Sequence, residues 1–276
     1  MVTRPAAVAG SFYPGHRAQL ERELDELLAG ATYVRRPDEK PDSDRGRSAP
    51  QSDAVKAIMV PHAGYVYSGS TAAPAYELVR DRAITRVVVL GPTHRVGIRG
   101  MALAGADAFD TPIGSVPVDA GLTRIAQSVP MVVTRPDVHA QEHSLEVQLP
   151  FIKTVLPQAS VLPVAVGDAL PEEVRALLEA VWGGAETLIV VSSDLSHYHP
   201  YDQARSLDAA TIAKITSLDA TVAPNRACGC FALNGLLVAG AEHHLRPTLL
   251  AARNSGDTAG DKGRVVGYAS FAFEDD

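Results

Sequence analysis

The chain has 276 residues, of which 46% are hydrophobic and 5% aromatic, so it is long enough to bury one large core as a single domain, 1–276. Its formal net charge is -7, and a mildly acidic protein has no overall field that attracts nucleic acid or an anionic membrane surface. No stretch of the sequence is apolar for long enough to span a membrane. We therefore expect no binding to nucleic acid or membrane.

The chain contains two cysteines, Cys228 and Cys230, which are separated by a single residue. A disulfide between them would be strained and would close almost no loop. Free thiols are typical of a reducing compartment. The N-terminal residues also lack the apolar stretch of a signal peptide. Together these features predict a cytoplasmic protein.

The first part of the chain is predicted to contain one helix, one polar loop and one strand–helix unit. Residues 17–29 repeat leucines at helical spacing, and residues 34–54 combine charges, Pro and Ser with few apolar residues. The first pattern indicates an amphipathic helix and the second a mobile loop. A short strand is expected at 56–60, followed by a helix that has Ser70 as its N-cap and Pro74 in its first turn.

The rest of the chain alternates β-branched apolar runs with helical patterns. Strands are predicted at 86–90, within 101–118, and at 161–166, 187–191, 247–252 and 264–273. Helices are predicted at 119–128, 144–156 (capped by Ser144), 171–181, 202–216 and 229–243. This alternation is typical of an α/β fold with a largely buried central sheet, mixed or mostly parallel and flanked by helices.

Three histidines follow predicted strands: His62 after 56–60, His94 after 86–90 and His197 after 187–191. Ligands of open α/β sheets bind at the carboxyl ends of the strands, so parallel neighbouring strands would bring these imidazoles together. Imidazole is both the commonest metal ligand and a frequent general acid or base. A single loop histidine is more often structural, but three at matching positions predict a metal or redox site.

Several neighbouring residues have two readings each. Asp194 could orient an imidazole or cap the following helix. Glu142 and His143 could supply a proton shuttle or cap the helix after them. Cys228, at the start of a helical pattern, could be a soft metal ligand or a small buried hydrophobe, and Cys230 competes for the same role.

Six motifs occur in order along almost the whole chain: AGSFYPG at 9–15, PHAGYVYSGSTAA at 61–73, GPTH at 91–94, EHSLEVQLP at 142–150, SSDLSHY at 192–198 and GDKGRVVGYAS at 260–270. Together they resemble the Memo (mediator of cell motility) family. Its bacterial and archaeal members are called protein B of the AmmeMemoRadiSam system.

The resemblance implies a fold like that of the class III extradiol dioxygenases and a site for iron or copper. His62 and His94 match the two metal-binding histidines of the family, and Cys228 matches its metal-binding cysteine. Asp194 and His197 match the remaining residues of the pocket. Because a thiol here replaces the carboxylate ligand of the dioxygenases, the resemblance does not carry over ring-cleaving activity.

The function expected from these features is a metal-dependent oxidoreductase. His62, His94 and Cys228 would hold the metal, while His197, oriented by Asp194 and helped by His143, would move protons. The alternatives are a non-enzymatic module that binds metal or peptide, and a zinc-dependent hydrolase. The family resemblance also suggests a functional link to a radical-SAM protein. The sequence does not identify the small-molecule or peptide ligand.

Overall fold

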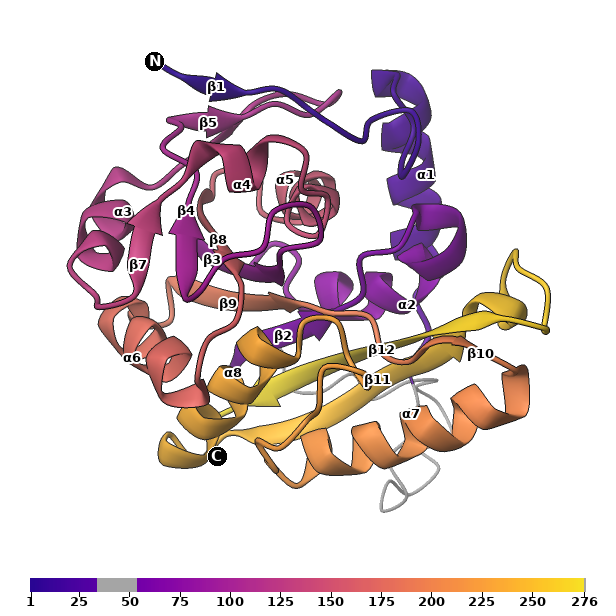
Figure 1. Cartoon of the computed structure of the whole chain (residues 1–276). Coiled ribbons are helices and arrows are strands. Elements are labelled where there is room, and N and C mark those ends of the chain that lie inside the picture. Colours follow the sequence, from indigo (N-terminus) through magenta and orange to yellow (C-terminus); the bar gives the residue numbers. More distant parts are fainter. Residues whose placement is uncertain (34–53, 276) are drawn as a thin grey trace.

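A computed structural model describes residues 1–33 and 54–275. Apart from its last residue, the predicted polar loop at 34–54 lies outside these ranges. The described chain forms a nine-stranded mixed sheet in the order β10-β12-β2-β9-β3-β8-β4-β7, with β11 paired to β12 (Figure 1). The strands are β2 (Val55–Val60), β3 (Arg86–Pro92), β4 (Met101–Leu103), β7 (Val132–Thr134), β8 (Ser160–Val166), β9 (Thr187–Ser192), β10 (His197–His199), β11 (Arg246–Asn254) and β12 (Val265–Glu274).

The centre of the sheet consists of four parallel strands, β2, β9, β3 and β8. Antiparallel pairs flank them, β12 beside β2 and β4 beside β8. In this register Val60 is level with Ser192, and Leu90 is level with Val191. The carboxyl ends of β2, β9 and β3 therefore meet at one edge of the sheet. The predicted mixed sheet is confirmed.

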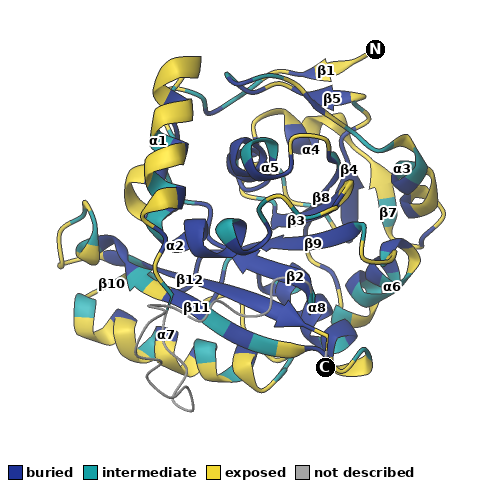
Figure 2. Cartoon of the chain, turned by 180° about the vertical axis from the view of Figure 1, so that it is seen from behind, coloured by how far each residue is buried: buried dark blue, intermediate teal, exposed yellow. Residues whose placement is uncertain are grey.

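Helices cover both faces of the sheet, because the side chains of its strands alternate between two apolar layers. Ile58 and Val60 of β2 pack into one core, whereas Ala57 and Met59 pack into the other. The first core is covered by α1 (Arg17–Ala29), α2 (Tyr65–Leu78), α4 (Pro136–Ala140) and α5 (Leu149–Val155), and the second by α3 (Ala120–Gln127), α6 (Pro171–Val181), α7 (Tyr201–Thr216) and α8 (Cys230–Glu242). Figure 2 shows the buried strands and, farther out, exposed residues along α1 and α7.

The predicted start of the second helix is wrong. Helix α2 begins at Tyr65, with Gly64 at its N-cap position, so Pro74 lies inside the helix. The Tyr65 N–H donates to the carbonyl of Phe12, a contact between distant parts of the chain. The Ser70 hydroxyl accepts a hydrogen bond from Arg253 and caps nothing. A tertiary contact has thus extended the helix by more than a turn toward its N-terminus.

The predicted cap at Ser144 is also wrong. Its hydroxyl donates to the carbonyl of Pro92, and a 3-10 turn, η2 (Glu146–Gln148), precedes α5. The other predicted helices match within a few residues; the one expected at 229–243 is α8. No helix in the described part of the chain is long and apolar enough to cross a membrane.

The N-terminal arm is fixed by one buried carboxylate. Strand β1 (Thr3–Arg4) joins a small sheet with β5 (Ala108–Phe109) and β6 (Val116–Pro117). Glu146 pairs with Arg4 and accepts hydrogen bonds from the Tyr13 hydroxyl and from the N–H groups of Ala7 and Val8. These bonds hold the segment that contains Phe12, and Phe12 lines the pocket described below.

Candidate metal centre

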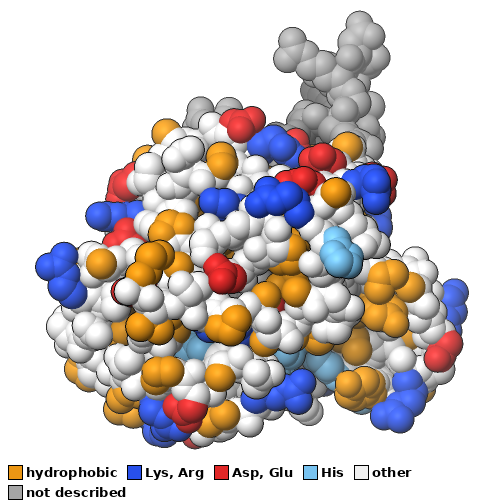
Figure 3. Space-filling model, turned by 90° about the horizontal axis from the view of Figure 1, so that it is seen from above, with side chains coloured by type: hydrophobic (Ala, Val, Ile, Leu, Met, Phe, Trp, Pro, Cys, Tyr) orange, Lys and Arg blue, Asp and Glu red, His pale blue; other side chains and the backbone are white. Residues whose placement is uncertain are grey.

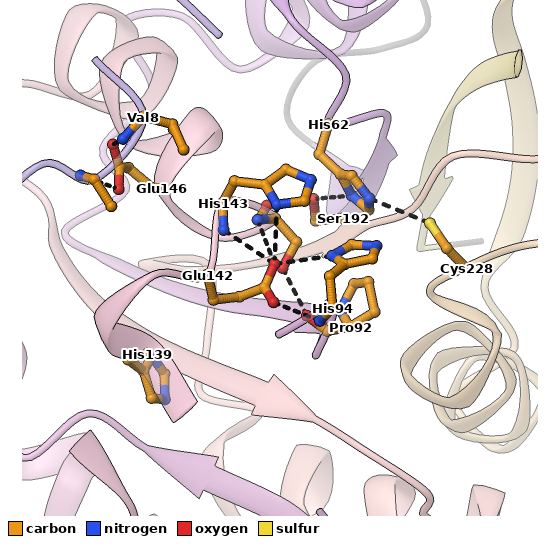
Figure 4. Close-up of polar contacts among 12 residues, drawn as sticks. Val8, His62, Pro92, His94, His139, Glu142, His143, Glu146, Ser192 and Cys228 are labelled. Atoms are coloured by element: carbon orange, nitrogen blue, oxygen red, sulfur yellow. Dashed lines mark hydrogen bonds and ion pairs between the residues drawn. The ribbon is translucent and has the colours of Figure 1, made fainter. Parts of the chain in front are cut away.

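Three imidazoles lie together at the carboxyl edge of the sheet (Figure 4). His62 follows β2, His94 follows β3, and His143 comes from the segment between α4 and η2. The ring centroids of His94 and His143 are 4.6 Å apart, and His62 lies 5.2 and 5.6 Å from them. One ligand nitrogen from each residue lies within 4.8 Å of the others. This spacing allows the three side chains to hold one metal ion.

Hydrogen bonds determine which nitrogen of His62 faces the cluster. Its Nδ1 lies 2.9 Å from the Ser192 hydroxyl, which donates its own hydrogen to the Ser144 carbonyl at 2.7 Å. The hydroxyl also accepts a bond from the Gln148 amide. Because a hydroxyl has one hydrogen, His62 must donate through Nδ1. Its Nε2 therefore carries the lone pair that a metal requires.

Glu142 orients His94 in the same way. One carboxylate oxygen lies 2.9 Å from His94 Nδ1, and the other accepts the backbone N–H of His94 at 2.5 Å. The N–H groups of His143 and Ser144 also donate to this carboxylate. Burial alone would raise the pKa of Glu142, but these bonds outweigh it and lower the pKa to about 2. The carboxylate is ionised, so His94 donates through Nδ1 and keeps the lone pair on Nε2.

His143 completes the cluster. Its ring stacks on His94 and lies against Phe12, with centroids 4.6 Å apart in each case. Its buried Nδ1 makes no hydrogen bond to the residues that the structure describes, and it lies 3.4 Å from a Glu142 carboxylate oxygen. A buried polar atom without a hydrogen bond costs free energy, and a bound ion would reduce that cost.

The protonation of the cluster suits a cation. Burial, together with the neighbouring imidazoles, lowers the pKa of His62 well below its ordinary value and that of His143 to about 4. Metal ligation requires neutral imidazoles, and burial favours that form at neutral pH. The neutral forms of His62 and His143 thus suit a metal ion, and the spacing of all three imidazoles fits one ion.

Cys228 lies beside this cluster rather than within it. Its Sγ is 3.2 Å from His62 Nε2 and accepts the Asp194 N–H at 3.3 Å. The set of atoms close enough to share an ion contains His143 in place of the expected thiol. Burial raises the pKa of Cys228, which keeps the group a thiol. Cys230, the first residue of α8, packs in the second core, where burial raises its pKa to about 11; of the two cysteines, Cys228 is the one at the pocket.

Asp194 and His197 do not form the expected pair. The Asp194 carboxylate accepts the backbone N–H of His62 at 2.7 Å, and His197 Nδ1 bonds to the Leu195 carbonyl at 2.8 Å. A carbonyl only accepts, so His197 donates through Nδ1 and presents Nε2. Burial raises the pKa of Asp194 to about 7, against the N–H bonds that lower it. Asp194 therefore holds the His62 backbone instead of orienting the His197 ring.

One pocket of about 980 Å³ is lined by His62, His94, His143, Asp194, His197 and Cys228. Its walls include the aromatic residues Phe12, Tyr67, Tyr198 and Tyr268. Figure 3 shows histidine side chains set in a recessed part of one face, among hydrophobic ones. The pocket has room for a small organic molecule above the imidazoles.

Comparison with known proteins supports the sequence resemblance. The profile of the Memo-like protein family matches residues 4–272. The chain belongs to the Memo family. A MEMO1 family protein of Metallosphaera sedula is 34% identical over 302 residues, covering 100% of both chains. One from Aquifex aeolicus is 34% identical, covering 99% of this chain and 100% of its own. An uncharacterized Escherichia coli protein of known structure overlaps 79% of the chain with a TM-score of 0.49 and 15% identity.

Sequence reasoning placed His143 near the site of this Memo protein as a proton shuttle, but did not place it among the clustered imidazoles. His143 follows no strand, so the strand-end pattern that singled out the other histidines misses it. Glu142 and Ser192, which orient His94 and His62, were not recognised as their partners. The only available signal was their place in motifs that also contain His143 and Asp194.

Proposed function

We propose that this Memo-family protein binds one iron or copper ion on His62, His94 and His143 and acts as an oxidoreductase on a small organic substrate in the adjoining pocket. The observation that carries the proposal is the convergence of three imidazoles, with ligand nitrogens within 4.8 Å of one another, beside the pocket that they line. When bound, such an ion supplies redox chemistry and open coordination positions.

The surrounding residues prepare these ligands. The Ser192 hydroxyl and the Glu142 carboxylate each accept a hydrogen bond from the Nδ1–H of a ligand, which leaves the lone pair of that ligand on Nε2. Such partners of metal-ligating histidines raise ligand basicity and fix ring orientation. We assign Glu142 and Ser192 to positioning, not to contact with the substrate.

Asp194 and His197 are the proposed proton-transfer groups. The pKa of Asp194, at about 7, suits a group that must exchange protons near neutral pH. His197 presents Nε2 because its Nδ1 is bonded to Leu195. Both side chains line the pocket, where they can reach a substrate that lies above the imidazoles.

Cys228 is the proposed additional ligand. Its thiol and a metal ion compete for the same lone pair on His62 Nε2, so the contact between the two residues must break when the ion binds. Loss of the thiol proton to solvent would then give a soft anionic ligand next to the three imidazoles.

The proposal is tested by anaerobic reconstitution with Fe(II), followed by assays of oxygen uptake with catechols. We expect uptake with the wild type, none with His94→Ala, and at least tenfold less with Cys228→Ala than with Cys230→Ala, which removes a thiol from the core instead of the pocket. Reconstituted wild type that consumes no oxygen would contradict the oxidoreductase, and equal rates for both cysteine variants would contradict the role of Cys228.

A zinc-dependent hydrolase is the second candidate, because a set of three imidazoles also suits zinc. Here Asp194 or Glu142 would act as the base; Asp194 fits better, since Glu142 is ionised and already bound to His94. This function predicts zinc in protein purified without added metal, and hydrolysis of an ester such as 4-nitrophenyl acetate that His94→Ala abolishes.

A non-enzymatic module predicts tight metal or peptide binding without turnover in either assay. The link to a radical-SAM protein stays a prediction from the family resemblance. The genes that flank the coding sequence provide a direct check.

A further inference from the structure

One permanent positive charge lies at the wall of the pocket. Among the described residues that line it, Arg264 is the single Lys or Arg. The lining carboxylates are Asp194, which is buried, and Asp261, which accepts the Gly263 N–H. Arg264 forms no ion pair with any carboxylate in the described ranges, and its side chain is exposed. The guanidinium thus lies at the pocket wall without an ion-pair partner among the described residues.

Tyr198 fixes the place of this guanidinium. The Arg264 Cζ lies 5.2 Å from the centroid of the Tyr198 ring. A cation over an aromatic face is held by electrostatic attraction to the ring. Arginine keeps its forked donors available at the rim of the stacked plane, where they can bind a carboxylate through two hydrogen bonds.

The backbone of Tyr198 is in a conformation that disfavours its own side chain. Its φ is +61°, in the left-handed region, and the residue lies in an irregularity of the β10–β12 pairing between His197 and His199. Bulky residues rarely adopt this conformation, and such strain is concentrated at functional sites. Tyr198 is nevertheless 63% exposed, so burial of its ring does not explain the strain.

We propose that Arg264 and Tyr198 form the recognition element for a small organic carboxylate bound in this pocket. The guanidinium would bind the carboxylate, and the apolar body of the ligand would pack on the aromatic wall. The single guanidinium among the described lining residues balances the one negative charge of a carboxylate, whereas a phosphate dianion would keep an unbalanced charge there. The inference deepens the proposed function by naming its ligand class, but it requires no bound metal.

Binding of three probes of similar shape tests this assignment: benzoate, its neutral analogue benzamide, and phenyl phosphate. The full chain is treated with a chelator and titrated calorimetrically at about pH 8, above the ordinary pKa of an imidazole. We expect benzoate to bind more tightly than the other two. Arg264→Gln should weaken benzoate roughly threefold to tenfold and leave benzamide unchanged.

Lys262→Gln is the matched control. Lys262 lies two residues away, over the ring of Tyr201 at 4.5 Å, and does not line the pocket. The Lys262→Gln substitution removes the same charge from the same loop and should leave the affinity for benzoate unchanged. If both variants lost the same benzoate affinity, the loss would reflect only the change in net charge, and the proposal would be overturned. Preference for benzamide or phenyl phosphate, or no benzoate binding, would overturn it as well.

Tyr198→Gly tests the second member of the pair. Glycine adopts the left-handed conformation without strain, so the variant should unfold at a Tm no lower than that of the wild type. Its affinity for benzoate should still fall. Unchanged affinity for benzoate would contradict a role of the Tyr198 ring in binding. A Tm below that of the wild type would contradict strain in the Tyr198 backbone. Because no metal is present in this assay, a failure of the metal site leaves its outcome unaffected.

Discussion

Glu142 shows how a single side chain can organise the candidate centre. Its side chain is 1% exposed. The carboxylate accepts hydrogen bonds from the ring and the backbone N–H of His94, and from the backbone N–H groups of His143 and Ser144. One carboxylate thereby joins the loop after β3 to the segment that carries His143. Two of the three imidazoles depend on it for their position.

Replacing Glu142 by Gln preserves its shape but removes the charge that favours the Nδ1–H form of His94. We expect metal affinity to fall roughly tenfold to a hundredfold, as is typical for partners of metal-ligating histidines. Competition with a chromophoric chelator measures the change. Glu173→Gln, which affects an ion pair with Arg99 on the surface, should leave the affinity unaltered. Wild-type affinity in Glu142→Gln would show that the carboxylate does not support the site.

A buried histidine outside the cluster makes stability depend on pH. His139 lies apart from the cluster (Figure 4), and burial lowers its pKa to about 4. In the unfolded chain the pKa returns to an ordinary value of about 6.5. The unfolded state therefore binds more protons between these values, so the free energy of unfolding must fall as the pH drops below about 6.5.

For His139 alone this loss amounts to about 2 kcal/mol between about pH 7 and pH 5. Urea denaturation of chelator-treated wild type and His139→Gln measures it. The variant should lose about 2 kcal/mol less than the wild type over that interval, since Gln does not titrate. Parallel pH profiles would contradict a neutral buried His139.

At the scale of elements, sequence reasoning succeeded where periodicity and burial agree. The apolar runs before His62 and His94 form β2 and β3, and the run before Asp194 forms β9, side by side at the centre of the sheet. It failed at the start of α2, because the Tyr65 N–H is satisfied by Phe12, more than fifty residues earlier in the chain. Local capping rules contain no information about such a contact.

The packing of α6 against α8 gives a further test at this scale. A Cβ added at Gly235 would lie 2.3 Å from Val174 of α6, whereas one at Gly240, on the same helix, meets its neighbours at 3.4 Å or more. Gly235→Ala should therefore destabilise the protein by about 1–3 kcal/mol through overpacking.

Gly240→Ala is its matched control and should be neutral or stabilising by up to about 1 kcal/mol, since Ala favours a helix over Gly. Urea denaturation measures both variants. If Gly235→Ala were as stable as Gly240→Ala, the two helices would not be in the close contact described.

At the scale of the whole molecule, the site is assembled from segments that are far apart in sequence. The loops after β2, β3 and β9 meet because their strands are neighbours, which a strand-end pattern can predict. His143 and Phe12 follow no strand of the sheet. His143 lies in the segment before η2, and Phe12 lies in the N-terminal arm that Glu146 holds. Their positions depend on buried polar contacts across the molecule, so periodicity could not predict them.

The central claim is that the three imidazoles bind one transition-metal ion, and elemental analysis of protein purified without added metal tests it most directly. We predict about one ion of iron, copper or zinc per chain in the wild type. His94→Ala should lose this ion, whereas His139→Gln, which alters a buried histidine outside the cluster, should keep it. A wild type with far less than one ion per chain, or a His94→Ala variant with undiminished metal, would contradict the account.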